Sequence, residues 1–165
     1  IRRACGDMLA FIEAALFLSR EEDRSINQTA SSDVVAIVRQ LVDDLQGDLD
    51  VAGIQLDTRF DSALTLPVPE SLVKITLTNL LRNAIEHSAG GHITVHLHGN
   101  RLLLCDTGKG IEPDVLPYIF DRSYSTKAEG TGLGLNMVKR ICERYGWQID
   151  IDSQPGEGTA VTLTF

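Results

Sequence analysis

Apolar side chains recur every three or four positions near the start of the chain, which is the spacing of an amphipathic helix. The apolar positions of this stretch, residues 4–22, are Met8, Leu9, Ile12, Ala15, Leu16 and Phe17. A lone helix leaves such a stripe unburied, so we expect a partner helix or a second chain to cover it. The polar and unpatterned stretch that follows, up to Ser32, indicates a linker.

A second helical pattern begins after Ser32, whose hydroxyl we expect to cap the helix, and it ends at Gly53. Its apolar stripe consists of Val34, Val35, Ile37, Val38, Leu41, Val42 and Leu45. Residues 54–60 alternate between apolar and polar, as a strand with one buried face does. Pro69 then fits the first turn of another helix, which we expect to run to about His87.

The rest of the pattern predicts two hairpins. Residues 92–98 and 101–105 alternate on either side of a Gly-Asn turn. Residues 147–152 and 159–165 do the same on either side of a Gln-Pro-Gly turn. A helical pattern over 132–145 precedes the second hairpin.

The stretch between the first hairpin and this last helix, residues 106–131, is rich in Gly, Pro, Ser and Thr and has no period. We therefore predict a long mobile loop, and a long loop inside a compact domain usually carries function. The order of elements predicts an α/β (α+β) fold, a two-layer sandwich of helices on a mixed, mostly antiparallel sheet. One isolated helix precedes this sandwich.

Composition narrows the range of functions. The chain has 165 residues, a net charge of −8 and a pI near 4.9, which argues against a nucleic-acid partner. Cys5, Cys105 and Cys142 are odd in number and widely spaced, which favours free thiols in a reducing compartment. The chain contains no apolar run long enough to span a bilayer. It begins at Ile1 rather than Met, so we interpret it as a fragment whose parent protein could carry an anchor in the inner membrane.

Alternating glycines occupy the segment 130–135, Gly-Thr-Gly-Leu-Gly-Leu, directly before an amphipathic helix. Glycines let the backbone approach a ligand closely, and a helix N-terminus offers unpaired N–H groups to an anion. The segment therefore suggests a phosphate cradle, although a flexible loop with incidental glycines fits equally well. No Lys-Ser or Lys-Thr follows it, so it is not a Walker loop.

A second motif, Asp106-Thr107-Gly108-Lys109-Gly110, directly follows an apolar run. An Asp at the end of a strand can accept a hydrogen bond from an exocyclic amine such as adenine N6. The two glycines would allow the next loop to hinge. A simple turn capped by Asp is the alternative.

Two asparagines recur in the helix 70–87, where this poor helix former is unexpected. At 100° per residue, Asn79 and Asn83 lie on one face, separate from the apolar face of Leu77, Leu80, Leu81 and Ala84. A carboxamide oxygen suits Mg²⁺, which keeps water and phosphate oxygens as its other ligands. A pair of asparagines on a solvated face is the alternative.

In chain order, the pair Asn79 and Asn83, the Asp106 motif, Phe120 and the glycine segment 130–135 resemble the N, G1, F and G2 boxes of sensor histidine kinases. These kinases belong to a superfamily that includes DNA gyrase, the MutL proteins and a heat-shock chaperone. The resemblance covers residues 33–165 and implies the catalytic ATP-binding domain with its ATP lid, the Bergerat fold. Residues 1–25 resemble the second helix of a dimerisation and histidine-phosphotransfer hairpin, which leaves 26–32 as linker.

The resemblance implies roles for single residues. Asn83 would coordinate Mg²⁺, and Asn79 would support the triphosphate site from the preceding turn. His87 would pack beside adenine, and Asp106 would bind adenine N6. The residues that would shape the pocket, anchor the lid and bind the phosphates are Gly108, Gly110, Phe120, Gly130, Thr131, Gly132, Leu133 and Gly134.

One position departs from the family pattern. Many relatives have Lys where this chain has Glu86, and a carboxylate there would repel ATP unless it turned outward. We expect a cation from elsewhere, with Arg82, Arg122 and Lys127 as candidates. The lid segment after Phe120 is also short.

The phospho-acceptor histidine is a second departure, because no His lies in the first helix. We expect it upstream of Ile1, in the dimerisation domain of the same protein, with a response regulator as the downstream partner and a homodimer as the full-length state. His96 and His98 share one strand face and suggest a metal pair. Without a third ligand in the sequence pattern, two surface histidines are the favoured interpretation.

Two other functions compete with a histidine kinase. A mechanical ATPase of the same superfamily would carry Glu as general base one turn before the Mg²⁺-binding Asn. This chain has Asn79 there, which cannot take a proton. A degenerate nucleotide-binding module is the other alternative, and Glu86 is its best support.

Overall fold

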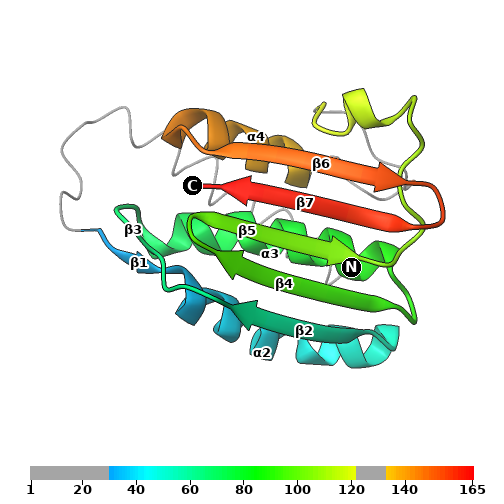
Figure 1. The fold of residues 1–165 in the computed structure, drawn as a ribbon, viewed down its shortest axis with the longest axis horizontal. Helices are drawn as coiled ribbons and strands as arrows, with labels where there is room; N and C mark the ends of the chain where they lie inside the picture. The colour runs from blue at the N-terminus through cyan, green and yellow to red at the C-terminus, as the bar shows by residue number, and fades with distance from the viewer. Residues whose placement is uncertain (1–29, 122–132) are drawn as a thin grey trace.

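The structure, a computed structural model, describes residues 30–121 and 133–165 (Figure 1). The predicted helix 4–22 and most of the predicted linker lie outside these residues. The described elements are, in chain order, β1 (Ser32–Asp33), α2 (Val34–Ala52), β2 (Gln55–Phe60), β3 (Thr65–Leu66), α3 (Glu70–His87), β4 (His92–His98), β5 (Arg101–Asp106), the 3₁₀ turn η1 (Leu116–Tyr118), α4 (Leu133–Tyr145), β6 (Gln148–Gln154) and β7 (Gly158–Thr164).

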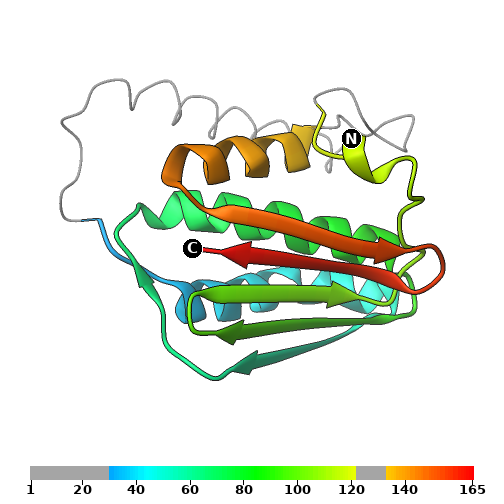
Figure 2. The same ribbon diagram turned by 45° about the horizontal axis from the view of Figure 1, so that its top comes forward.

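A five-stranded sheet with the order β2-β4-β5-β7-β6 forms one layer of the molecule. Strand β2 runs parallel to β4, and every other neighbouring pair is antiparallel. Helices α2, α3 and α4 cover one face of this sheet, as the two ribbon views show (Figures 1 and 2). The predicted two-layer α/β sandwich with a mixed sheet is therefore confirmed.

The core lies between the helices and the inner face of the sheet and is almost wholly aliphatic. Each central strand contributes alternate residues, and α3 contributes one stripe of leucines. The buried leucines of this layer are Leu97, Leu102, Leu104 and Leu163 from the sheet and Leu72, Leu77, Leu80 and Leu81 from α3. Full burial of such a side chain contributes about 1.5–3 kcal/mol, so this layer holds α3 firmly against the strands.

The ends of α2 show one prediction that is wrong and one that is confirmed. Asp33, rather than Ser32, caps the helix, because its Oδ1 accepts from the N–H of Ala36 at 3.1 Å. Ser32 is buried in a two-stranded ladder with β3, where its hydroxyl donates to the carbonyl of Val68. Gly53 ends the helix in the left-handed region with φ of 65°, as predicted.

The predicted loop 106–131 is more ordered at its start than the sequence pattern indicates. Strand β5 includes Asp106, and the 3₁₀ turn η1 places Ile119 in a buried position. Residues 122–131 lie outside the described part. Strands β6 and β7 also extend further toward their connecting turn than predicted. Among the residues that the structure describes, no helix has the length and apolar character needed to cross a membrane.

Candidate nucleotide-binding site

At one end of the inner sheet face, polar residues replace the apolar core. Asp106 on β5 is directly opposite Thr159 on β7, which in turn is opposite Ser153 on β6. Opposed residues of neighbouring strands point to the same side of a sheet, so these three form one row. Ser153 Oγ lies 2.9 Å from Thr159 Oγ1, and Asp106 is only 9% exposed. The row presents a carboxylate and two hydroxyls at the edge of the core.

The carboxylate of Asp106 is oriented by its own turn. Its Oδ1 accepts from the N–H of Gly108 at 2.8 Å. Within the described residues, no hydrogen bond of the protein to Oδ2 is found. A half-engaged carboxylate at the end of a buried strand is able to accept a hydrogen bond from a ligand amine.

The turn after Asp106 rests on the C-terminal end of α3. The N–H of Lys109 donates to the carbonyl of His87 at 3.2 Å. Gly108 lies so close to that carbonyl that an added Cβ would collide with it, and would also lie 2.7 Å from Asp106 Oδ1. His87 is half-buried in the last turn of the helix. Only glycine fits at position 108. Its pocket-shaping role stays a prediction.

Gly110 is fixed by the turn between β6 and β7. Its φ is 67°, and a Cβ there would collide with the carbonyl of Gln154. The N–H of Gly156 donates to the carbonyl of Lys109 at 2.8 Å, and that of Ile111 to Ser153 Oγ at 2.9 Å. The segment that leads toward the predicted lid is therefore anchored on the β6–β7 hairpin.

Asn79 joins α3 to the start of α4. Its side-chain NH₂ donates to the carbonyl of Ile75 at 2.8 Å, which fixes the orientation of the amide. A Cβ built on Gly134 would lie 2.7 Å from Asn79 Oδ1. Two motifs 55 residues apart are thus in contact, with the amide oxygen facing the first turn of α4.

The other predicted residues of α3 lie in the following turns. Asn83 is half-buried one turn after Asn79, and Arg82 is half-buried beside it. Glu86, where the family resemblance implied a Lys, is exposed. The apolar residues Leu77, Leu80, Leu81 and Ala84 are all buried, as predicted.

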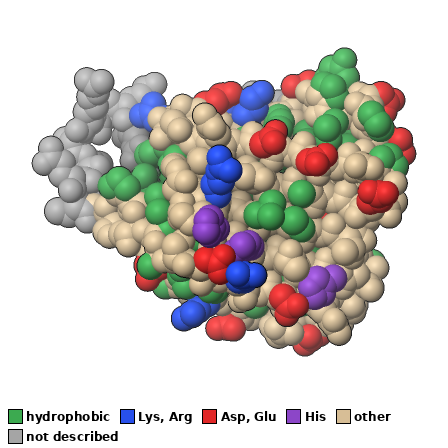
Figure 3. Space-filling model, in the orientation of Figure 1, with side chains coloured by type: hydrophobic (Ala, Val, Ile, Leu, Met, Phe, Trp, Pro, Cys, Tyr) green, Lys and Arg blue, Asp and Glu red, His purple; other side chains and the backbone are tan. Residues whose placement is uncertain are grey.

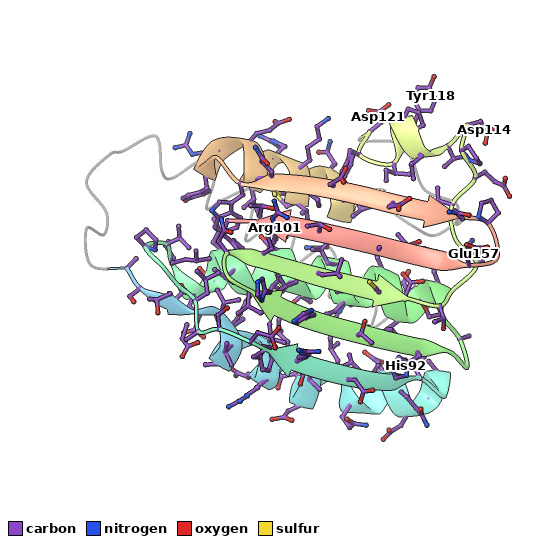
Figure 4. The ribbon with its side chains drawn as sticks, in the orientation of Figure 1. His92, Arg101, Asp114, Tyr118, Asp121 and Glu157 are labelled. Atoms are coloured by element: carbon purple, nitrogen blue, oxygen red, sulfur yellow. The ribbon has the colours of Figure 1, made fainter. Side chains whose placement is uncertain are left out.

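Phe120 is tied to α4. Its carbonyl accepts from Asn136 Nδ2 at 2.9 Å, and Lys139 Nζ lies 5.6 Å from its ring centroid. Figure 4 shows Tyr118 and Asp121 on the same loop, outside the edge of the sheet formed by β6. The start of the predicted lid is therefore attached to the helix that follows the lid.

Several predicted residues cannot be placed. Arg122, Lys127, Gly130, Thr131 and Gly132 lie outside the described residues, and their roles stay predictions. Leu133 is the first residue of α4.

The sequence pattern did not reveal several polar residues that the structure adds to this region, namely Ser153, Thr159, Asn136 and Lys139. Their placement depends on strand register and helix packing. Gly158, which precedes Thr159, is required by this geometry, because its φ is 104° and a Cβ there would collide with the carbonyl of Asp106.

Comparison with known proteins identifies the family. Residues 68–165 match the model of the histidine kinase-, DNA gyrase B- and HSP90-like ATPases. This chain belongs to that family. The predicted resemblance is thereby confirmed.

Similar proteins in sequence are sensor kinases. The chain is 39% identical over 119 residues to sensor histidine kinase ZraS of Escherichia coli (strain K12), an alignment that covers 66% of this chain and 25% of ZraS. It is 36% identical over 121 residues to sensor histidine kinase YkoH of Bacillus subtilis (strain 168), an alignment that covers 68% of this chain and 26% of YkoH. Histidine protein kinase DivJ of Caulobacter vibrioides is 30% identical over 175 residues, covering 99% and 29%. The chain thus spans between a quarter and a third of these relatives.

Solved structures support the same fold. The mycobacterial sensor histidine kinase MprB gives a TM-score of 0.72 at 22% identity, over 81% of this chain and 93% of that one. Full-length ShkA, solved in complex with AMPPNP, gives a TM-score of 0.73 at 24% identity, over 98% of this chain and 36% of ShkA.

Proposed function

We propose that this chain is the ATP-binding catalytic domain of a two-component sensor histidine kinase, which transfers the γ-phosphate of ATP to a histidine outside this sequence. One observation carries the proposal. Three motifs that are distant in sequence are joined through α3, where Asn79 in the middle of the helix contacts Gly134 and the turn after Asp106 rests on His87 at its end.

The adenine end of the site is assigned to Asp106. Its carboxylate is buried and has one oxygen engaged with Gly108. A hydrogen bond from adenine N6 to the other oxygen would be charge-assisted and therefore strong. Thr159 lies beside Asp106 in the same row, so its hydroxyl is a further polar group for the base. His87 would contact the ring from the last turn of α3.

The phosphate end is assigned to α3 and the start of α4. The half-buried amide of Asn83 supplies an oxygen of the kind that Mg²⁺ accepts, with water and phosphate oxygens completing the shell. When bound, the ion supplies neutralisation of phosphate charge. The N–H groups that open α4 are donors for the same phosphates, with Gly134 allowing close approach. Arg82, Arg122 and Lys127 are the candidates to replace the cation missing at Glu86.

The chemistry of Asn79 favours phosphoryl transfer over hydrolysis. A hydrolase of this family needs a general base to activate water, and a carboxamide has no basic site. An imidazole acceptor is already a nucleophile, so the site only has to position ATP and neutralise charge. Asn79, whose amide is held by Ile75, fits such a positioning role.

The proposal also includes the partners. Residues 1–25 would be the second helix of a dimerisation and phosphotransfer hairpin, 26–32 a linker, and 33–165 the catalytic domain. The acceptor histidine would belong to the upstream part of the same protein, which would act as a homodimer in the cytoplasm and pass the phosphoryl group to a response regulator.

The decisive experiment supplies the upstream helical hairpin of the parent protein as a separate polypeptide. We expect label from [γ-³²P]ATP to reach the hairpin in an acid-labile, base-stable form, the mark of phosphohistidine. The chain alone should turn over ATP negligibly. Vigorous hydrolysis without transfer would assign the chain to the mechanical ATPases, and the absence of nucleotide binding would indicate a degenerate module.

A further inference from the structure

A cluster of metal-binding side chains lies on the outer face of the sheet, opposite the helices and the nucleotide site. Figure 3 shows histidine and acidic side chains side by side on this face. The cluster consists of His96 and His98 on β4 and Asp61, which follows β2. Asp61 is the third ligand, which the sequence pattern of His96 and His98 did not reveal.

The three ligand atoms are already close together. Asp61 Oδ2 lies 2.6 Å from His96 Nε2 and 3.5 Å from His98 Nδ1. All three atoms lie within 4.8 Å of one another. In a tetrahedral zinc site with bonds of about 2.0–2.2 Å, two ligand atoms stand about 3.3 Å apart. Small side-chain rotations would therefore bring this group to coordinating geometry.

Neighbouring groups orient the carboxylate toward the imidazoles. Arg59 Nε donates to Asp61 Oδ1 at 2.9 Å, which leaves Oδ2 directed to His96 and His98. The backbone N–H of Asp61 donates to the carbonyl of Leu97 at 2.9 Å, so the carboxylate is held beside β4. Hydrogen bonds to ligating carboxylates are a regular feature of metal sites, because they fix the ligand before the ion arrives.

We propose that Asp61, His96 and His98 bind one Zn²⁺ ion, with water in the fourth position. Two imidazoles and one carboxylate are a ligand set that zinc accepts. The nearby guanidinium of Arg59 opposes the ion's charge, and His98 is 77% exposed and must be ordered on binding. The site is therefore weaker than a buried structural zinc site.

Zinc at this position would cross-link the edge strand of the sheet to its neighbour. Strand β2 is the edge strand beside β4, and Asp61 follows its last residue. A bond through the metal would join the C-terminal end of β2 to the C-terminal end of β4. Opening of that edge would become rarer, because the ion binds the closed form and not the opened one.

The matched control is His92. It lies on the same strand and face, is half-exposed, and pairs with a carboxylate of β2, since its Nε2 is 3.2 Å from Asp57 Oδ2. Figure 4 places His92 at the opposite end of the sheet from Arg101, which is the residue paired with His98. Four residues of strand separate His92 from His96, about 13 Å.

The experiment measures zinc affinity by competition with a chromophoric chelator at pH 7.5, without nucleotide. The protein is tag-free and carries Cys5→Ser and Cys105→Ser, so that these two thiols do not contribute ligands. We expect one Zn²⁺ per chain and at least a tenfold loss of affinity in Asp61→Asn, His96→Ala and His98→Ala. His92→Ala should bind as the parent does. Hydrogen exchange of the β2 amides should slow on zinc addition in the parent and not in His96→Ala.

Co²⁺ in place of Zn²⁺ gives a readout that needs no variant, because four-coordinate Co²⁺ absorbs strongly in the visible range. A parent protein that shows neither the cobalt spectrum nor competition with the chelator would overturn the proposal. So would unchanged affinity in Asp61→Asn, or a loss in His92→Ala as large as that in His96→Ala. In those cases the cluster is a hydrogen-bonded surface group.

Discussion

The side-chain oxygen of Asn79 lies against the backbone of Gly134, so closely that a Cβ added at position 134 would lie 2.7 Å from it. The contact joins the helix that carries the predicted magnesium ligand to the helix that carries the predicted phosphate donors. Because the Asn79 amide is also bound to the carbonyl of Ile75, it cannot turn away without losing a hydrogen bond. The two helices are thereby held at one spacing.

Substitution of Gly134 by Ala tests this contact. Its Cβ would lie 2.7 Å from Asn79 Oδ1, so Asn79 must shift. We expect the free energy of unfolding of Gly134→Ala to be lower than that of the control Gly47→Ala by about 1–3 kcal/mol, a typical cost of overpacking. Gly47 is exposed in α2 with nothing within 4 Å of an added Cβ, so its substitution should stabilise by about 0.5–1 kcal/mol.

Urea unfolding of both variants gives this comparison, and a double mutant provides the control. Asn79→Ala should remove the clash, so the cost of Gly134→Ala should shrink in that background by about 0.5–3 kcal/mol. Additive effects of the two substitutions would show that the contact is not the cause.

Asp106→Asn should weaken adenine-nucleotide binding by about 1.5–3 kcal/mol, the contribution of a hydrogen bond to a charged acceptor. The Asn oxygen can still accept from Gly108, so the turn should persist. Titration with a non-hydrolysable ATP analogue measures the change. Asp152→Asn, an exposed position on β6, removes the same charge and should have no effect. Equal affinities for wild type and Asp106→Asn would contradict the adenine assignment.

Asn83→Ala should abolish the magnesium dependence of ATP binding and leave the fold intact. The residue is half-buried and lies off the leucine face of α3, so its loss opens no core cavity. Calorimetric titration with and without Mg²⁺ measures the effect, and circular dichroism checks the fold. Asn100→Ala, at an exposed hairpin turn, is the control. Full magnesium dependence in Asn83→Ala would remove this residue from the site.

The Cys142 thiol should be inert in the folded protein. Its burial in α4 raises its pKa from 9.0 to about 12, because an apolar environment disfavours the thiolate. The unfolded thiol ionises at the lower value, so the stability that Cys142 contributes is present below pH 9 and is lost as the pH rises toward 12.

Thiol labelling at pH 8 checks this prediction in a variant with Cys5→Ser and Cys105→Ser. We expect no reaction with Ellman's reagent under native conditions and rapid reaction in urea. Rapid labelling of the native protein would show that α4 opens locally.

The sequence was sufficient for what depends on local pattern. The buried leucine face of α3, with Asn79 and Asn83 off it, followed from the helical spacing of the apolar residues. The end of α2 at Gly53 followed from the conformation that glycine adopts easily. Each of these features depends only on residues a few positions apart in the sequence.

Features that depend on non-local pairing could not be predicted in this way. Thr159 and Ser153 join Asp106 only through the register of β5, β7 and β6. Asp61 meets His96 because β2 lies parallel to β4, a pairing between segments separated by a whole helix. Ser32 was predicted to cap α2, but its hydroxyl is buried against the carbonyl of Val68 and Asp33 caps the helix instead.

The attachment of Phe120 to Asn136 has a consequence for how such domains diversify. The chain leaves and re-enters the described structure at nearly one place, since Phe120 is bound to the helix that begins at Leu133. An insert whose two stems are fixed together can change in length at little entropic cost, about 0.6 kcal/mol for each doubling. Evolution can therefore change the length and sequence of this segment while the scaffold beneath it stays as it is.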